Sequence, residues 1–135
     1  MSHQIFVNLP VRDLEASKAF FRALGYANNP QFTDENAACV VISESIYVML
    51  LVEPFFQGFT RKAICDSRTH TEVILCLSAE SRTAVDSMVD RALAAGGGEP
   101  MEAKDYGFMY QRSFQDLDGH LWEVVHMDEG AMPAD

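Results

Sequence analysis

One glutamate in an apolar segment is the residue of this sequence best placed to do chemistry. Glu123 stands between Trp122 and Val124 in the strand-like run 120–127. A carboxylate that points inward from such a strand must be ion-paired, hydrogen-bonded, metal-bound or protonated, and it is then suited to act as a general base. A solvent-facing carboxylate on an edge strand is the alternative. The residues alone leave both alternatives open, and Glu123 is the candidate catalytic residue if it faces inward.

Two other polar side chains could join Glu123 at a metal or acid–base site. Glu72 lies at the start of the β-like run 71–77, and His70 stands two residues before it, on the same side of an extended chain. Histidine binds metals and transfers protons near neutral pH. Because the run begins among polar residues, a solvated strand end explains Glu72 equally well.

Aromatic and amide side chains offer a wall for a small-molecule site. Large apolar residues are buried in any domain, but a concave apolar surface with a few polar groups is also the usual form of a binding pocket. Asn8 is an amide in an apolar strand and needs a hydrogen-bond partner, either a ligand or a neighbouring backbone group. The Phe-rich segment 55–59 is the best candidate for a lid. The residues predicted to contact a ligand on these grounds are Phe6, Asn8, Tyr47, Phe56 and Tyr110.

The candidate residues fall in two segments with the same order of expected elements. Asp13 and Ser81 are suited to cap a helix, and glycines follow each apolar helical stripe. The first segment has expected strands at 5–11, 26–33, 37–42 and 46–52, with a helix after the first of them. The second has expected strands at 71–77, near 99–103, at 108–114 and at 120–127, again with a helix after the first.

The repeated order predicts an α+β fold built from two βαβββ halves. The halves span about 1–53 and 70–128, are joined by 54–69, and form one domain of residues 1–135. A half of this size exposes too much sheet to be stable alone, so the two should form a curved mixed sheet around a cleft. Aligning the last turns of the two halves gives Met49 the position of Glu123, which adds Met49 to the predicted ligand-binding residues.

Composition restricts the compartment and the partners. Ten basic and twenty acidic residues give a net charge of −10, which argues against nucleic acid as a partner. No apolar run approaches the roughly 20 residues that cross a bilayer, and residues 1–4 lack the features of a signal peptide. We therefore predict a cytoplasmic protein with no membrane partner. The cysteines, an odd set without CxxC spacing, indicate neither a disulfide framework nor a zinc knuckle.

Two segments resemble the vicinal-oxygen-chelate superfamily, which includes glyoxalase, bleomycin-resistance and extradiol-dioxygenase proteins. They are LPVRDL at 9–14, with FF at 20–21 and LGY at 24–26, and FQDLDGHLWE at 114–123. The resemblance covers nearly the whole chain and is closest to the group called predicted lactoylglutathione lyases. It implies a small-molecule ligand and a homodimer. Within the closing segment we interpret Asp116, Asp118 and Gly119 as turn-forming residues.

The resemblance also implies four strand positions that hold a divalent ion in metal-dependent members. Carried over to this sequence, these positions are Phe6, Met49, Glu72 and Glu123, with Ile74 as the alternative to Glu72. Phe and Met are not ligands for hard or borderline divalent ions. The expectation is therefore either no metal or a weakly bound divalent ion at Glu72, Glu123 and His70.

Three functions follow from the resemblance. The first is a glyoxalase-like protein with a degenerate metal site, in which an inward carboxylate carries out a lyase or isomerase reaction. Arg112 could help to hold the carboxylates of a thiol-conjugated substrate, so we add it to the ligand-binding residues. The second is a non-catalytic protein that binds or sequesters a small molecule, as bleomycin-resistance members do. The third is an extradiol dioxygenase, which needs two histidines and a carboxylate that the carry-over does not supply.

Overall fold

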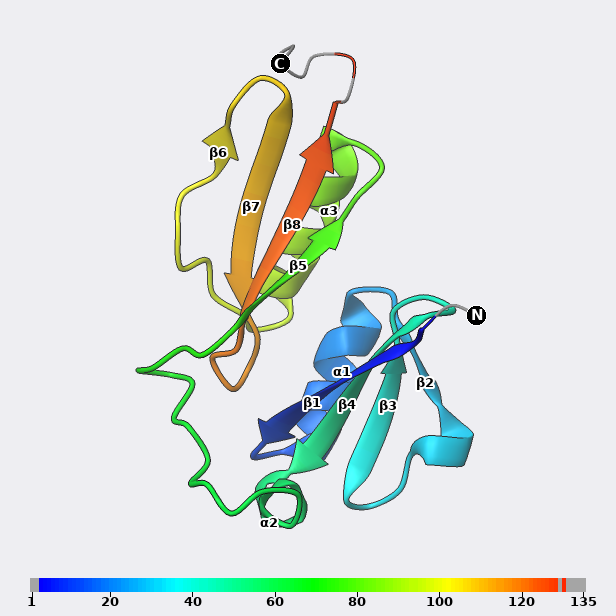
Figure 1. The fold of residues 1–135 in the computed structure, drawn as a ribbon. Helices are drawn as coiled ribbons and strands as arrows, with labels where there is room; N and C mark the ends of the chain where they lie inside the picture. The colour runs from blue at the N-terminus through cyan, green and yellow to red at the C-terminus, as the bar shows by residue number, and fades with distance from the viewer. Residues whose placement is uncertain (1–2, 129, 131–135) are drawn as a thin grey trace. The chain divides into compact units, whose positions relative to one another are not determined.

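A computed structural model of the protein describes residues 3–128 and residue 130. The chain divides into two compact units, Met1–Asp66 and Ser67–Asp135. In each unit a strand is followed by a helix and then by three strands (Figure 1). The α+β class and the two βαβββ repeats predicted from the sequence are therefore confirmed, and each repeat forms its own four-stranded mixed sheet.

The sheet of the first unit has the strand order β1-β4-β3-β2, in which only β1 and β4 are parallel. Its elements are β1 (Ile5–Val11), α1 (Leu14–Ala23), β2 (Ala27–Asn29), the 3-10 helix η1 (Pro30–Phe32), β3 (Ala37–Val41), β4 (Ile46–Val52) and α2 (Glu53–Gln57). The strand predicted at 26–33 is cut short. Asn29 caps η1 by accepting a hydrogen bond from the amide of Gln31, and Pro30 has no N–H to offer a neighbouring strand.

Helix α1 packs on one face of this sheet. Asp13 caps it by accepting a hydrogen bond from the amide of Ala16 at 3.0 Å, and Gly25, with φ of 104°, follows its end. The predicted apolar stripe is buried against β2, β3 and β4; its members are Leu14, Phe20, Phe21 and Leu24. Because side chains alternate along a strand, the residues of the other parity face away from α1.

The second sheet has the order β5-β8-β7-β6, in which only β5 and β8 are parallel. The elements of this unit are β5 (Ile74–Ser78), α3 (Arg82–Ala94), β6 (Lys104–Asp105), β7 (Met109–Gln115) and β8 (Leu121–Met127). Two predicted strands are corrected. The one predicted at 71–77 begins only at Ile74, and the one near 99–103 is replaced by β6, since Pro100 lacks the N–H that a strand ladder needs.

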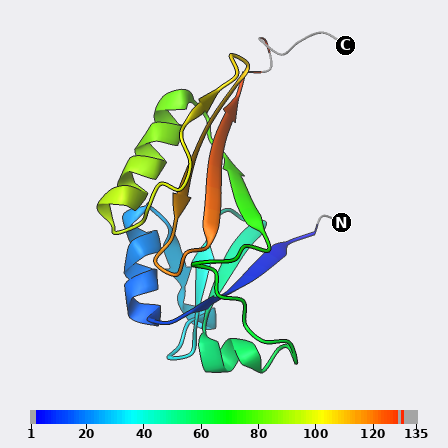
Figure 2. The same ribbon diagram turned by 90° about the vertical axis from the view of Figure 1, so that its left-hand side faces the viewer.

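Helix α3 covers one face of the second sheet (Figure 2). Ser81 caps it by accepting a hydrogen bond from the amide of Ala84 at 3.0 Å. Val85, Val89 and Ala92 are buried on the helix, and the rings of Phe114 and Trp122 stack with centroids 5.9 Å apart. Since Trp122 and Val124 are both buried, alternation along β8 directs Glu123 to the opposite face.

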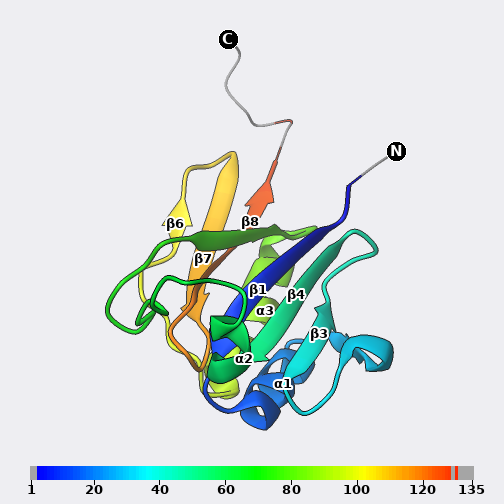
Figure 3. The same ribbon diagram turned by 60° about the horizontal axis from the view of Figure 1, so that its bottom comes forward.

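The segment predicted as the connection, 54–69, contains most of α2, which follows β4 directly (Figure 3). The helix contacts β1 and β4, and Phe56 on it is half-buried. Among the described residues, no helix has both the length and the apolar character needed to span a membrane.

Candidate functional site

A buried carboxylate builds the turn between β7 and β8. Asp116 accepts hydrogen bonds from the amides of Asp118 and His120 at 3.1 and 3.0 Å, and from the indole N–H of Trp122 at 3.1 Å. Burial raises the pKa of Asp116, while these hydrogen bonds act in the opposite direction. Gly119 has φ of 87°, a conformation that favours glycine. The structural interpretation of the motif at 116–119 is confirmed.

The turn holds residues 67–71 against the sheet. The hydroxyl of Ser67 donates to the carbonyl oxygen of Asp118 at 2.7 Å. A Cβ added to Gly119 would lie 2.8 Å from the carbonyl oxygen of Ser67 and 2.9 Å from the Cα of Arg68. Only glycine permits this approach without a backbone shift, so the turn determines where the segment lies.

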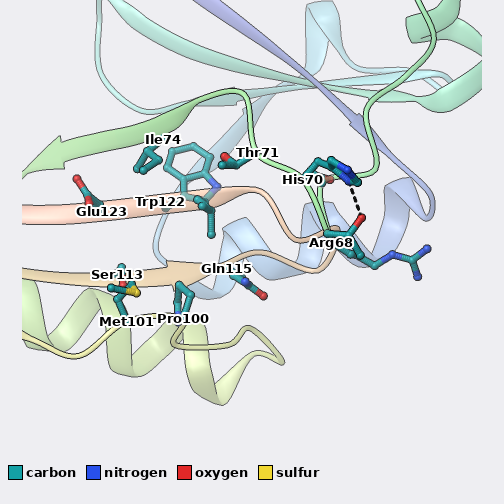
Figure 4. A pocket seen from close by; sticks show the side chains of 13 residues that line it. Arg68, His70, Thr71, Ile74, Pro100, Met101, Ser113, Gln115, Trp122 and Glu123 are labelled. Carbon is teal, nitrogen blue, oxygen red and sulfur yellow. Dashed lines mark hydrogen bonds between the residues drawn. The ribbon is translucent and has the colours of Figure 1, made fainter.

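Residues 67–71 and the sheet face turned away from α3 line an open pocket of about 260 Å³ (Figure 4). Ile74 and Leu121 supply apolar strand side chains, while Pro100 and Met101 line the pocket from the segment before β6. The polar strand side chains of the lining are Ser113, Gln115 and Glu123. All of these residues belong to the second unit, and an apolar pocket with a few polar groups is the usual form of a small-molecule site.

Glu123 has a defined hydrogen-bond partner but no ion pair in the described part of the chain. The amide nitrogen of Gln111 donates to Oε2 of Glu123 at 2.9 Å. Among residues 3–128 and 130, no salt bridge includes Glu123. The register places Ser113 opposite Glu123 on β7 and Cys76 opposite it on β5. Burial, and then the charge of Glu123, raise the pKa of the Cys76 thiol, which keeps it neutral.

Ser113 has an unsatisfied hydroxyl. The residue is only 7% exposed, and its Oγ has no hydrogen-bond partner among the described residues. Buried polar atoms are nearly always paired in folded proteins, so an orphan in a pocket wall indicates a group that a ligand or a water would satisfy. Neither Ser113 nor Gln111 is among the residues predicted from the sequence.

Four of the predicted ligand-binding residues share one face of the first sheet. The register pairs Phe6 with Tyr47 and Asn8 with Met49, on the face turned away from α1. The rings of Phe6 and Tyr47 stack with centroids 4.9 Å apart. The structure thus brings these residues together within the first unit, as their shared parity predicts.

Tyr110 and Arg112 lie on the helix side of the second sheet, so their strand separates them from Glu123. The hydroxyl of Tyr110 donates to Asp86 at 2.6 Å, and Arg112 binds Asp86, Asp90 and Glu99 at 3.1, 3.0 and 3.1 Å. Burial alone would lower the pKa of Arg112, but the three carboxylates outweigh it and raise that pKa. The prediction that groups these two side chains with Glu123 in one pocket conflicts with this placement.

The predicted metal positions do not supply a ligand set. Glu72 precedes β5 and is exposed, whereas His70 lines the pocket with its Nδ1 2.9 Å from the hydroxyl of Thr69. Phe6 and Met49 carry no nitrogen or oxygen ligand, and the Phe6 ring is engaged in stacking. Within the described residues, no group of three or more His, Cys, Asp or Glu side chains could hold an ion. The residues present do not fit the four-ligand site of the metal-dependent proteins.

Comparison with known proteins agrees with this architecture. Residues 4–43 match a family model described as bleomycin resistance protein-like N-terminal. A glyoxalase-related enzyme from Fulvimarina pelagi is 23% identical, with a TM-score of 0.79 over 93% of this chain and 88% of that one. A hypothetical protein from S. aureus, SA1046, is 30% identical, with a TM-score of 0.78 over 93% of this chain and 95% of that one. The chain belongs to the vicinal-oxygen-chelate superfamily.

Another protein of similar fold is an antibiotic binding protein. TnmS3, an antibiotic binding protein from Streptomyces sp. CB03234, is 19% identical to this superfamily member, with a TM-score of 0.64 over 94% of this chain and 97% of that one. At this identity the likeness concerns the fold alone. No curated protein matches the sequence.

Proposed function

We propose that this member of the superfamily binds and sequesters a small organic molecule in the pocket of its second unit. The observation that carries the proposal is that one apolar pocket wall holds both a Glu123 carboxylate with no ion pair and a Ser113 hydroxyl with no hydrogen-bond partner among the described residues. Such groups cost stability in the empty protein and are satisfied when a ligand binds. The antibiotic-binding description of TnmS3 supports the same class of function.

A steric block of the pocket tests this proposal. Ile74 lines the pocket and is 49% exposed, while its neighbour Val73 is 52% exposed and is not part of the lining. Ile74→Trp should fill the pocket, and Val73→Trp is the matched control. Thermal melts with a panel of antibiotics and metabolites should show compounds that stabilise the unmodified protein and Val73→Trp but not Ile74→Trp. The proposal fails if no compound stabilises the protein, or if Ile74→Trp responds equally.

A lyase or isomerase reaction is the second candidate, and the position of Glu123 on the pocket wall favours it. As a general base, its carboxylate would take the proton from the hydroxyl-bearing carbon beside a substrate carbonyl and return it to the carbonyl carbon, while the hydroxyl proton passes to the carbonyl oxygen. The hemithioacetal of methylglyoxal and glutathione is the substrate to test. Turnover that Glu123→Gln abolishes and Glu80→Gln preserves would support the reaction, because Glu80 is an exposed carboxylate outside the pocket. No turnover would leave sequestration as the function.

The proposed setting is a cytoplasmic homodimer. The three cysteines, Cys39, Cys65 and Cys76, are all free thiols, which suits a reducing compartment. Strands β1 and β5 each stand at the edge of their sheet, and exposed edges are commonly covered by association. Light scattering at micromolar concentration should give twice the chain mass of 15.1 kDa, and a monomer mass would refute the dimer.

A further inference from the structure

The polar groups around Glu123 define what kind of ligand atom can sit between them. A carboxylate can only accept hydrogen bonds, so the Gln111 amide must direct its nitrogen at Glu123, as it does at 2.9 Å. This bond fixes the carboxylate and leaves its Oε1 without a hydrogen-bond partner among the described residues. Opposite residues of an antiparallel pair have Cβ atoms roughly 5 Å apart. An atom between Glu123 and Ser113 can therefore reach both.

A protonated amine satisfies this pair of groups better than the alternatives. Its N–H groups can donate to Glu123 and to the Ser113 hydroxyl, and its charge balances the carboxylate. An anion would be repelled by Glu123, and a neutral hydroxyl would leave the carboxylate uncompensated in a partly desolvated site. The net charge of −10 adds a long-range attraction for cations.

The other charged groups of the pocket lie away from this position. Arg68 and His70 also line the pocket, but Figure 4 shows the Arg68 guanidinium directed away from Glu123, with His70 on the same side as Arg68. Arg112 neighbours Ser113 in sequence but points to the other face of the sheet, where Asp86 and Asp90 of α3 and Glu99 bind it. Neither arginine competes with a ligand for Glu123.

We propose that Glu123 and Ser113 form a subsite for an alkylammonium group, with Gln111 as the residue that positions the carboxylate. The inference rests on the proposed small-molecule function and specifies the ligand class for the same pocket. The apolar body attached to the amine would lie against Ile74 and Leu121. The Ser113 hydroxyl oxygen accepts a hydrogen bond from one N–H of the amine, so it gains the partner that it lacks among the described residues.

Three probes of the same shape test the charge requirement on the full chain. Phenylbutylamine, phenylbutanol and phenylbutanoate differ only in the terminal group, and titration calorimetry gives their affinities. Binding that is lost in Ile74→Trp and kept in Val73→Trp places the probe in the pocket. The amine should bind at least about tenfold more tightly than the alcohol, in line with the strength of charge-assisted hydrogen bonds. The carboxylate should not bind measurably.

Substitutions at Glu123 and Ser113 test whether these two residues cause the preference for the amine. Glu123→Gln should abolish the preference for the amine while the alcohol still binds, which also shows that the pocket remains folded. Ser113→Ala should weaken the amine about threefold to tenfold, by the loss of one hydrogen bond. Glu80→Gln is the control, because it removes the same charge from an exposed site outside the pocket and should leave all three affinities unchanged.

The outcomes separate this inference from the proposed function. If the alcohol binds as tightly as the amine, or if Glu123→Gln keeps the preference, the ammonium subsite is wrong and the binding function stands. If no probe binds but a panel compound is excluded by Ile74→Trp, the subsite is again wrong and the function again stands. If neither a probe nor a panel compound binds, both proposals fall.

Discussion

The two units present sheet faces of equal topology and very different chemistry. On the first sheet, the face turned away from α1 carries the stacked Phe6 and Tyr47, together with Asn8 and Met49. On the second, the equivalent face carries Glu123 held by Gln111. The repeat therefore fixes where a side chain points, while the residue at each position decides whether the face is an apolar surface or a polar site.

Segments outside the sheets add a second difference between the units. In the second unit, residues 67–71 are held on the β7–β8 turn by Ser67 and Gly119, and with Pro100 and Met101 they convert a sheet face into a pocket. In the corresponding β3–β4 turn of the first unit, the amide of Ser45 donates an exposed hydrogen bond to the hydroxyl of Ser43 at 3.3 Å. A recognition site thus needs a supported wall in addition to the strands.

The largest expected difference in the free energy of unfolding is between variants of the β7–β8 turn and variants of the β3–β4 turn. Asp116→Ala removes the acceptor of three hydrogen bonds at a buried position and should lower the free energy of unfolding by about 3–5 kcal/mol. Ser43→Ala should cost no more than about 0.5 kcal/mol, because its bond is exposed. Urea denaturation of both variants measures the difference. Equal effects would show that the β7–β8 turn is no better supported than its counterpart.

The glycines of the second unit give the next largest effect. Gly119→Ala imposes left-handed strain and a contact of 2.8 Å with the Ser67 carbonyl oxygen, so it should cost about 2–3 kcal/mol and displace residues 67–71. Gly107→Ala is the matched control: φ is +83°, but nothing lies within 4 Å of the added Cβ, so only strain of about 1 kcal/mol remains. Comparable losses in the two variants would contradict the role of Gly119 in holding the segment.

The sequence predicted the elements and missed the partners of Glu123. Helix caps and apolar periods are local signals, and Asp13 and Ser81 act as predicted. The partners depend on strand register. The run 109–115 alternates, with Tyr110 and Arg112 on one face and Gln111 and Ser113 on the other. The turn at 116–119 sets the register of β7 and β8. That register would have identified Gln111 and Ser113 as the residues on the same sheet face as Glu123.

The position of Glu72 shows a different limit of the sequence. Residues 71–73 include two β-branched side chains and read as the start of a strand, yet β5 begins at Ile74. Propensity is a weak guide where tertiary contacts decide, and here the chain from residue 67 follows the turn that holds it. Contacts over 51 positions, such as that of Ser67 with Asp118, have no local sequence signal.

Acid should weaken the second unit through an ion pair at its surface. Arg82 binds Asp105 in a bidentate manner at 2.7 and 2.9 Å, and these bonds lower the pKa of Asp105 to about 2. Since the folded pKa lies below the unfolded value of about 3.9, the stabilisation is present above that value and is lost as pH falls toward 2. The melts of the unmodified protein and Asp105→Asn should differ at pH 7, and the difference should narrow between about pH 4 and pH 2. A gap as wide at pH 2 as at pH 7 would contradict the assignment, and Glu80→Gln should show no such narrowing.

The smallest expected change in stability is at Glu123, the candidate catalytic and ligand-binding residue. Glu123→Gln keeps the size of the side chain, its amide oxygen can still accept from Gln111, and the loss of a partly desolvated charge offsets the weaker hydrogen bond. The free energy of unfolding should stay within about 0.5 kcal/mol of the unmodified protein. Glu99→Gln is the contrast, because Glu99 binds Arg112, which is 13% exposed, and its loss should cost about 1–2 kcal/mol. Denaturation of the two variants side by side measures this difference. A loss above about 2 kcal/mol at Glu123 would make it a structural partner and remove the reason to expect a ligand there. A neutral result leaves its charge available to the bound molecule.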